Sequence, residues 1–355
     1  MNPVTRRVHV RVPATSANLG SGFDTVGLAL DYHDELTFTL SDDPADTDAH
    51  VNIEGEGAQT LPRDETHLVV STFRRACRTY GLGRLGFTLE AHNRIPQARG
   101  LGSSAEAIVA GIAAAAAFAQ EGELNRSAIF DLAATIEGHP DNVAPAVFGG
   151  LTVSWDFSTA EGVGSVPIPG GEPLHGGFHT VNYPVDPAIT AAVFVPDYEL
   201  YTEKARQALP ATLPYRDAVY NVSRVGLLPA AMNPGALAST TTASDGSDAD
   251  GGIAASVAPS ALAATANTLL YTATQDKLHQ PYRAALMEPS WNLIERFRSH
   301  GYAAAVSGAG PCVLVLHYGD ARGAIDAIAA EDLASGHWQV LHLPIDTAGV
   351  TVERG

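Results

Sequence analysis

Residues 95–115 read IPQARGLGSSAEAIVAGIAAA, and this stretch predicts both a buried helix and an anion site. Two glycines stand before a pair of serines, and an alanine-rich run follows. Alanine is the best helix former and serine is a good N-cap, so we expect a helix over 104–120 that begins beside the serines and is buried on most sides. The first N–H groups of a helix lack partners and carry partial positive charge, and glycines let the backbone come close to an anion. Phosphate is therefore the expected ligand.

The turn before this helix is not one of the common nucleotide motifs. It lacks the Gly-Lys-Ser/Thr of a Walker A loop and the spacing of the dinucleotide fingerprint. One of the serine hydroxyls, on Ser103 or Ser104, could reach a Mg²⁺ ion bound to the phosphates. Taken alone, the pattern also fits a tight turn that starts a helix and binds no ligand, and this alternative stays open here.

Strand and helix patterns continue on both sides of this stretch and indicate a mixed α and β protein in two halves. Period-two alternation predicts strands, and apolar stripes at helical spacing predict helices. We expect strands over 8–12, 36–40, 85–89, 151–155, 191–195, 303–306 and 313–317, and helices over 68–80, 127–137, 218–232 and near Leu262 and Trp291. Pro13 is expected to end the first strand. The Gly- and Pro-rich residues 162–177 indicate a boundary between a domain at 1–175 and one at 176–355.

Residues 233–260 differ from the rest of the second half. They are small, polar and acidic, and they show no periodicity. Such a segment cannot bury enough apolar surface to offset the entropy lost on ordering. We predict a mobile surface insertion here.

The chain is strongly acidic, which limits its partners. There are 39 Asp and Glu residues against 21 Lys and Arg residues, for a net charge of −18, and only Lys204 and Lys277 are lysines. Concentrated cations screen such self-repulsion, because the Debye length falls to about 3 Å in roughly 1 M salt. We therefore suspect a halophilic protein from a salty cytoplasm, with an ordinary acidic enzyme as the alternative. An acidic surface repels phosphate backbones, so nucleic acid is not an expected partner.

Cysteine usage and hydropathy point to a soluble, cytoplasmic protein. Cys77 and Cys312 are too few for a disulfide framework or a structural zinc site, and we expect both in the core. The N-terminus lacks the apolar region of a signal peptide, and the longest apolar run, 108–119, is well short of the ~20 residues of a membrane span.

Four collinear segments resemble the GHMP kinases. Residues 96–105 are similar to the phosphate-binding signature of that superfamily, which reads Pro, three variable residues and then GLGSSA. Three others resemble its homoserine kinase branch: VRVPATSANLGSGFDTVGLAL at 10–30, EGHPDNVAPAVFGG at 137–150 and SGAGP at 307–311. The resemblance implies an α+β, two-domain GHMP kinase fold, with a ribosomal S5 domain 2-like N-terminal domain and a ferredoxin-like C-terminal domain. It also implies that ATP and homoserine are the substrates and are held between the domains.

The resemblance assigns the ATP phosphates to the signature and to one residue beyond it. The residues are Pro96, Gln97, Ala98, Arg99, Gly100, Leu101, Gly102, Ser103, Ser104, Ala105 and Glu106. Hard oxygen ligands suit Mg²⁺, and the family's metal ligands correspond to Ser104 and Glu137. A surface carboxylate at a helix C-terminus is the alternative for Glu137, and the helix dipole disfavours it.

For the acceptor, the resemblance supplies groups that fit a zwitterionic amino acid. Arg206 and Arg283 would bind its carboxylate, because guanidinium groups bond carboxylates in a bidentate manner. The other assigned residues are Asp24 for the ammonium, Asn18 and Asn142 near the hydroxyl, Thr202 beside the first arginine, and His139 and Asp141 in support of that loop. Without the resemblance, both arginines would be read as surface charges.

Asn142 stands where mevalonate-type relatives have a catalytic aspartate, and an amide cannot act as a general base. We therefore expect Asn142, Asn18, Ser104 and Glu137 to act by positioning and electrostatic stabilisation, with direct attack of the hydroxyl and late loss of its proton. Gly308 and Gly310 either approach the substrate or form a simple hairpin turn.

Two residues depart from the family pattern near the nucleotide. Glu106 follows GLGSSA where relatives have a small residue, and His67 stands where the family often has asparagine near the adenine. Both put nucleotide affinity in doubt. Other open readings are a GHMP kinase for threonine or shikimate, and a catalytically silent sensor of nucleotide and metabolite. A homodimer is an expectation from the family.

Overall fold

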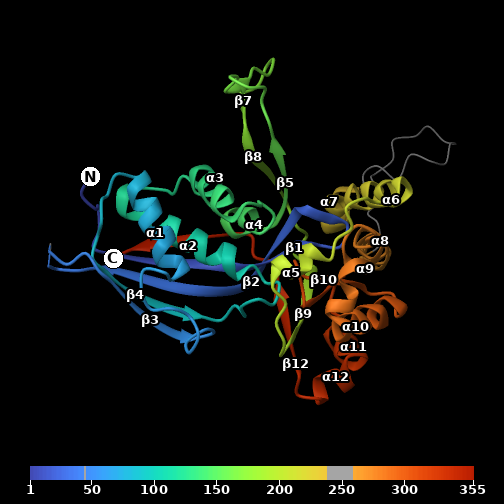
Figure 1. Ribbon diagram of the computed structural model, residues 1–355. Coiled ribbons are helices and arrows are strands. Elements are labelled where there is room, and N and C mark those ends of the chain that lie inside the picture. Colours follow the sequence, from blue (N-terminus) through green and yellow to red (C-terminus); the bar gives the residue numbers. More distant parts are fainter. Residues whose placement is uncertain (44, 238–258) are drawn as a thin grey trace.

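The computed structural model describes residues 1–43, 45–237 and 259–355, and its N-terminal half is built on one large sheet (Figure 1). The strand order is β13-β1-β2-β4-β3, with β5 pairing to β2 and β8 pairing to β5. These strands are β1 (Arg7–Asn18), β2 (Gly22–Leu40), β3 (Ala49–Gly55), β4 (Phe87–Asn93), β5 (Leu151–Phe157), β8 (Gly177–Tyr183) and β13 (Thr351–Arg354). Because β13 lies at the end of the chain, the sheet of the first half is completed by the last residues.

Four helices cover one face of this sheet (Figure 1). They are α1 (Leu68–Thr79), α2 (Ser103–Ala119), α3 (Arg126–Glu137) and α4 (Val143–Phe148). The central helix α2 is buried along nearly its whole length, as its alanine content predicted. It packs so closely on α1 that a Cβ at Gly111 would lie 2.7 Å from the Val69 carbonyl oxygen. Small side chains are therefore a packing requirement of this helix.

The C-terminal half has an antiparallel sheet in the order β10-β11-β9-β12. Its strands are β9 (Ile189–Pro196), β10 (Ala303–Val306), β11 (Val313–Tyr318) and β12 (Trp338–Pro344). The helical elements are α5 (Thr202–Gln207), α6 (Tyr215–Val225), α7 (Leu228–Met232), η1 (Pro234–Leu237), α8 (Pro259–Ala273), α9 (Gln280–Arg283), η2 (Ala284–Leu286), α10 (Glu288–Ser299), α11 (Arg322–Ile328) and α12 (Ala330–Ala334). One core cluster joins the halves, because Leu28 and Leu30 of β2 belong to the same buried group as Val193 and Leu314.

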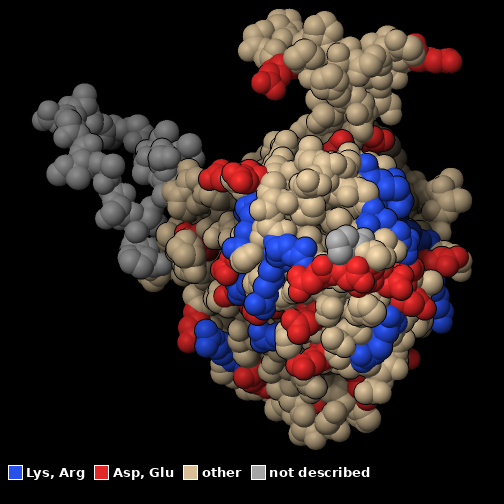
Figure 2. Space-filling model, turned by 90° about the vertical axis from the view of Figure 1, so that its left-hand side faces the viewer, with Lys and Arg blue, Asp and Glu red and all other residues tan. Residues whose placement is uncertain are grey.

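A long hairpin leaves the body of the molecule between the two halves. It consists of β5 and β8, and a small pair, β6 (Ser165–Val166) and β7 (Leu174–His175), lies near its tip. Figure 2 shows it standing away from the body with few charged side chains, and the sequence has no lysine or arginine between 151 and 183. The boundary expected at 175/176 falls inside this hairpin.

Several expected element ends are wrong, each for a local reason. The first strand continues through Pro13 to Asn18. The pairing of this strand with β2 shifts register between Pro13 and Ala14, and this irregularity accommodates a residue that has no N–H to donate. The helix expected over 218–232 is two helices that separate at Gly226. No serine caps α2. Its N-cap is Gly102 in the left-handed conformation, and no side chain bonds the free amides there.

Two other expectations have clear outcomes, and a third lies mostly outside the described residues. Both cysteines are buried, as expected. Within the described residues, no helix combines the length and the apolar character needed to cross a bilayer. Most of the predicted insertion at 233–260 lies outside the described residues. At its edges, Pro234–Leu237 form a 3₁₀ helix and Pro259 begins α8.

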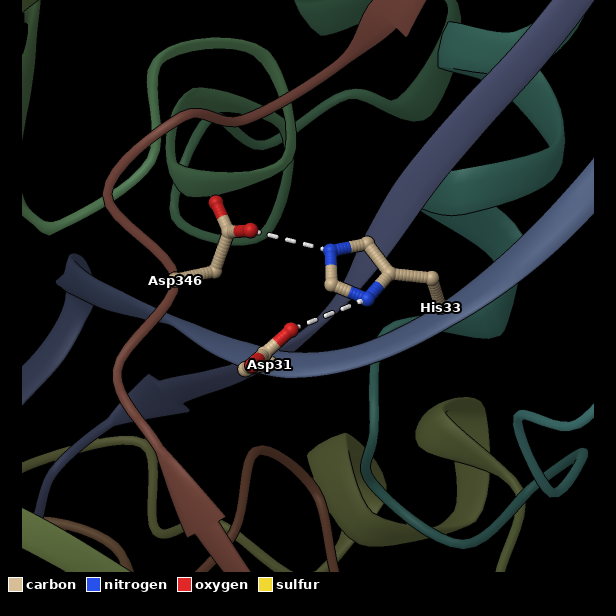
Figure 3. A group of neighbouring side chains, drawn as sticks. All are labelled: Asp31, His33 and Asp346. Carbon is tan, nitrogen blue, oxygen red and sulfur yellow. Dashed lines mark hydrogen bonds and ion pairs between the residues drawn. The ribbon is translucent and has the colours of Figure 1, made fainter.

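A buried histidine ties the C-terminal segment to β2 (Figure 3). His33 Nε2 lies 2.9 Å from Asp346 Oδ2, and Arg11 donates to His33 Nδ1 at 2.9 Å. Asp31 lies on the other side of the ring, 3.4 Å from Nδ1. Burial raises the pKa of Asp346, but the hydrogen bonds from His33 and from the amides of 348 and 349 outweigh it and hold this pKa below its usual value. Both ring nitrogens are thus engaged, and the cluster acts as a tether.

Candidate active site

The turn before α2 needs glycine at two positions. Gly100 has φ +84° and Gly102 has φ +71°, which is the left-handed region. A Cβ at Gly100 would lie 2.1 Å from the Ser307 carbonyl oxygen, and one at Gly102 would lie 1.9 Å from Thr15 Oγ1. The turn is therefore held between Thr15 of β1 and the loop after β10, which are both distant from it in the sequence. The first amides of α2, which have no intrahelical partner, lie beside it.

Backbone hydrogen bonds hold this turn in place. The Thr15 amide donates to the Leu101 carbonyl, and the Cys312 amide donates to the Arg99 carbonyl. Arg99 donates from Nε to the Pro196 carbonyl. Four members of the predicted phosphate signature line neither of the two cavities described below, namely Pro96, Arg99, Leu101 and Ala105. Of these, the arginine ties the turn to the second half of the molecule.

All of the side chains that we predicted for catalysis and for acceptor binding line a single cavity of about 190 Å³. They come from both halves of the molecule. The predicted members are Asn18, Asp24, Ser104, Glu137, His139, Asp141, Asn142, Thr202, Arg206 and Arg283. Gly308 also lines this cavity, so the C-terminal glycine loop is part of the site. We call this space the acceptor cavity.

Ser104 and Glu137 meet at one end of the acceptor cavity. Ser104 Oγ donates to Glu137 Oε2 at 2.8 Å. Glu137 is the last residue of α3, and Gly138 in the left-handed conformation ends that helix. Burial raises the pKa of the Glu137 carboxyl, against the effect of His139 and the Ser104 hydroxyl. Two hard oxygen atoms this close, one on a carboxylate that is only 11% exposed, suit Mg²⁺.

The loop after α3 carries a second pair of groups. His139 Nδ1 lies 2.8 Å from Asp141 Oδ1, and His139 Nε2 lies 3.8 Å from Glu137 Oε1. The hydrogen bond to Asp141 raises the pKa of His139, and burial opposes it. The histidine therefore stands between two carboxylates and holds the loop beside the Ser104–Glu137 pair.

Two guanidinium groups in different environments also line the acceptor cavity. Arg206 pairs with Asp24 through two hydrogen bonds of 2.8 Å, and its side chain is 38% exposed. Arg283 is buried and donates to the Ala205 carbonyl at 3.2 Å and to His279 Nδ1 at 3.1 Å. Burial lowers the pKa of Arg283 to about 10. The alternative of a surface charge is therefore excluded for Arg283.

Two asparagines are oriented by contacts inside the site. Asn142 Oδ1 accepts from the Thr15 hydroxyl at 2.8 Å, so its amide nitrogen is the donor left for a ligand. Asn18 donates to the Gly308 carbonyl at 2.8 Å and accepts from the Asp24 amide at 2.9 Å. Asn18 thereby joins three segments of the cavity wall.

Sequence reasoning missed two supporting residues. Thr15 lies inside a quoted motif, but its contact with Asn142 spans 127 positions. His279 is fully buried, donates from Nε2 to the Gly20 carbonyl at 2.8 Å and stacks on Phe23. The only sequence signal for it is its place four residues before Arg283, which puts both on one helical face.

A second cavity of about 420 Å³ adjoins the first and shares Ala98, Ser103, Ser104 and Tyr201 with it. It lies against the first turn of α2 and the start of α1. Leu61, Leu68, Val69 and Ile95 supply apolar walls, and Asp34, His67, Asn93, Gln97, Glu106 and Glu199 supply polar ones. The shared residues show that the start of α2 separates the two spaces. We call the second space the side cavity.

Comparison with known proteins gives a consistent picture. The family described as GHMP kinases N terminal domain matches residues 67–150, and GHMP kinases C terminal matches residues 260–333. A homoserine kinase of Clavibacter michiganensis is 40% identical over 349 residues, which is 98% of this chain and 94% of the relative. A homoserine kinase of Streptomyces coelicolor is 39% identical over 97% of this chain and 94% of its own length.

Solved structures agree on the fold. A homoserine kinase from Cytophaga hutchinsonii has a TM-score of 0.71 at 23% identity, with 99% of both chains covered. Mevalonate kinase of L. major has a TM-score of 0.65 at 13% identity, over 98% of this chain and 99% of its own. The predicted two-domain GHMP fold is thereby confirmed. From the relatives' identity over nearly the full length, this chain belongs to the homoserine kinase family of the GHMP kinases.

Proposed function

We propose that this protein transfers the γ-phosphoryl group of ATP to the side-chain hydroxyl of L-homoserine, forming O-phospho-L-homoserine for threonine biosynthesis. One observation carries the proposal. The acceptor cavity combines the amide-rich start of α2 with a Ser–Glu oxygen pair and with two guanidinium groups and a carboxylate. A zwitterion with a short hydroxylated side chain matches this distribution of charge.

The charged end of the cavity would bind the amino-acid part of the acceptor. Its carboxylate would accept from Arg206 and from Arg283, whose fixed position lowers the entropy lost on binding. Its ammonium would bind Asp24, which now pairs with Arg206. Thr202 begins α5 on the same wall. The hydroxyl would then lie toward Asn142 and Asn18.

The other end would hold the phosphates. The free amides of α2 and the glycine turn would bind the β- and γ-phosphates. Mg²⁺ bound by Ser104 and Glu137 would neutralise charge that develops on the phosphoryl oxygens. Glu137 must be ionised for this, and His139, placed between Glu137 and Asp141, favours the ionised form.

The residues around the hydroxyl act by position. The acceptor oxygen forms a bond to the γ-phosphorus as the bond to the ADP oxygen breaks, and the hydroxyl proton leaves to a phosphoryl oxygen. Asn142 cannot take that proton, and Thr15 fixes its amide so that Nδ2 donates to the acceptor oxygen. Rate enhancement would come from alignment and from amide donors at the developing charge.

An ADP-release assay with ATP and Mg²⁺ across homoserine, threonine and shikimate tests the proposal. We expect turnover that is fastest with homoserine. Faster turnover with threonine or shikimate would reassign the acceptor within the family. No ADP release with any of the three would support a nucleotide-binding sensor instead.

We also propose a salt-adapted, cytoplasmic homodimer. The net charge of −18 with two lysines supports salt adaptation. Figure 2 shows acidic and basic side chains side by side over one end of the molecule. The free energy of unfolding should rise from dilute buffer to about 2 M KCl as repulsion is screened, and a flat or falling value would refute this. Sedimentation tests the dimer.

A further inference from the structure

Two charged residues of the acceptor cavity come from different halves of the molecule. Asp24 lies near the start of β2, and Arg283 is the last residue of α9. An amino acid that binds both would place its ammonium and its carboxylate on them at the same time. The distance between the two residues must then match the distance between those two groups. Some contact of the fold must therefore fix Arg283 relative to the start of β2.

His279 makes that contact. Its side chain is fully buried and lies just before α9. Nδ1 is 3.1 Å from Nη1 of Arg283, and Nε2 is 2.8 Å from the Gly20 carbonyl oxygen. The ring also stacks on Phe23, the neighbour of Asp24, with the ring centres 4.9 Å apart. One side chain of the C-terminal half thus contacts both the guanidinium group and the segment that carries the carboxylate.

These two hydrogen bonds determine the tautomer of His279. A guanidinium group has only donors, so Nδ1 must accept from Arg283. A carbonyl oxygen only accepts, so Nε2 carries the hydrogen that it donates to Gly20. The ring is therefore neutral, and burial, which lowers the pKa of His279, favours this form. A ring with a proton on Nδ1 could not accept from the arginine.

The turn that carries His279 is itself held by a buried carboxylate. The Asp276 side chain is 0% exposed, and its two oxygens accept from the backbone amides of residues 278–280. Asn221 donates to Asp276 at 2.7 Å and to the Ser21 carbonyl at 3.2 Å. The position of the imidazole is therefore fixed by bonds of the protein and is in place before an acceptor binds.

Phe23 lies beside both guanidinium groups of the acceptor cavity. The Cζ atoms of Arg206 and Arg283 are 5.9 Å and 5.1 Å from its ring centre. An aromatic ring attracts a cation at such distances. Burial and, to a smaller extent, Arg206 lower the pKa of Arg283, so the two cations are close enough to repel each other. The stacked rings of Phe23 and His279 offset this repulsion and keep Arg283 in place.

We propose that His279 is a positioning residue for the acceptor. It holds Arg283 at the distance from Asp24 that an α-amino acid requires, and it thereby favours acceptors that carry an ammonium and a carboxylate on one carbon. The inference deepens the proposed function and rests on it. His279 does not line the cavity and acts through Arg283.

The test measures ADP release with homoserine and with 3-amino-1-propanol, which has the same hydroxyl and ammonium but no carboxylate. Wild type should favour homoserine in kcat/KM by about 100-fold, the effect expected of hydrogen bonds to a charged group. His279→Phe keeps a ring against Phe23 and removes both nitrogens. It should raise KM for homoserine at least about tenfold and leave kcat within about threefold, because it weakens binding in the ground state and the transition state alike. Its kcat/KM for 3-amino-1-propanol should stay within about threefold of wild type, since no carboxylate is lost.

His279→Asn is the conservative variant. Its amide oxygen takes the place of Nδ1 and accepts from Arg283, so the preference for homoserine should stay within about threefold of wild type. His33→Phe is the matched control. His33 is also buried with both ring nitrogens engaged, but among the described residues it bonds none that line the acceptor cavity. Its loss should leave the preference unchanged. The unfolding midpoint of each variant checks folding.

Three outcomes overturn the inference while the kinase assignment stands. They are an unchanged preference in folded His279→Phe, an equal loss of kcat/KM for both acceptors in that variant, and a preference in His279→Asn as low as in His279→Phe. If His279→Phe does not fold, loss of the preference in His279→Asn overturns it. If wild type releases no ADP with homoserine, the proposed function fails instead, and calorimetric affinities for the two acceptors decide the inference by the same ratios.

Discussion

The ion pair between Asp24 and Arg206 predicts which acceptors the enzyme can use. Both oxygens of Asp24 accept from the guanidinium at 2.8 Å, so the two groups neutralise each other in the free site. Homoserine offers an ammonium to Asp24 and a carboxylate to Arg206, and thus replaces one ion pair by two. 4-Hydroxybutyrate has the same carboxylate and hydroxyl but no ammonium. Its binding would leave Asp24 without a partner.

The size of this penalty follows from the exposure of the carboxylate. A hydrogen bond to a charged group contributes about 1.5–3 kcal/mol. The Asp24 side chain is 37% exposed, so water partly solvates it, and we expect the lower part of that range, about 1.5–2 kcal/mol. This corresponds to a kcat/KM for 4-hydroxybutyrate about 10- to 30-fold below that for homoserine.

The comparison is made by ADP release with both acceptors in wild type and in Asp24→Asn. The amide carries no charge for the ammonium, so the preference for homoserine should fall to about threefold or less. Asp320→Asn removes a charge from a side chain that is 82% exposed, and it should leave the preference unchanged. If Asp24→Asn prefers homoserine to 4-hydroxybutyrate as strongly as wild type does, Asp24 does not bind the ammonium group. The acceptor would then bind in a different orientation.

Three further predictions concern the turn, the proposed metal ligand Glu137 and the tether. Gly102→Ala should lower kcat at least about tenfold, because the new Cβ would displace Thr15, whose hydroxyl donates to Asn142. Gly81→Ala is the control: Gly81 also has a positive φ, +73°, but no atom lies within 4 Å of the added Cβ, so kcat should not change. Burial raises the pKa of Glu137, so the Mg²⁺ concentration that gives half-maximal rate should increase as pH falls from about 8 to about 6. Glu137→Gln should abolish this pH dependence. The same pH dependence in the variant would contradict the role of Glu137 as a metal ligand. Asp346→Ala should lower the free energy of unfolding by about 2–3 kcal/mol, because His33 and two amides lose their acceptor. The pKa of Asp346 is lower in the folded state than in the unfolded state. Its contribution to stability is therefore complete at pH values above the unfolded-state pKa, and it is lost as pH falls through the folded-state pKa. The difference in free energy of unfolding between variant and wild type, measured with denaturant, should therefore shrink below about pH 4.

Local patterns predicted local features well. The alanine-rich helix, the strands at 303–306 and 313–317 and the buried cysteines follow from propensity and periodicity, which act over a few residues. Where the predicted end of an element was wrong, a contact with a segment distant in the sequence determined the local conformation. Pro13 does not end β1, since the pairing with β2 shifts register between Pro13 and Ala14, and a proline is tolerated at such an irregularity. The serines do not cap α2, since Gly102 is pressed against Thr15 and must turn left-handed.

The sequence by itself determined the glycine turn before α2 and the family to which the chain belongs, because a helix start flanked by glycines is built from consecutive residues. The free amides of such a turn favour anions. Only the tertiary structure decided which charges face each other. Asp24 meets Arg206 across 182 positions in a partly exposed pair, and Glu106 meets Asp34 across 72 positions, where both side chains are buried. The strength of a polar contact depends on how much water and which partners surround it. Both are determined by the packing of segments that are distant in the sequence, and a local sequence pattern does not show which segments pack together.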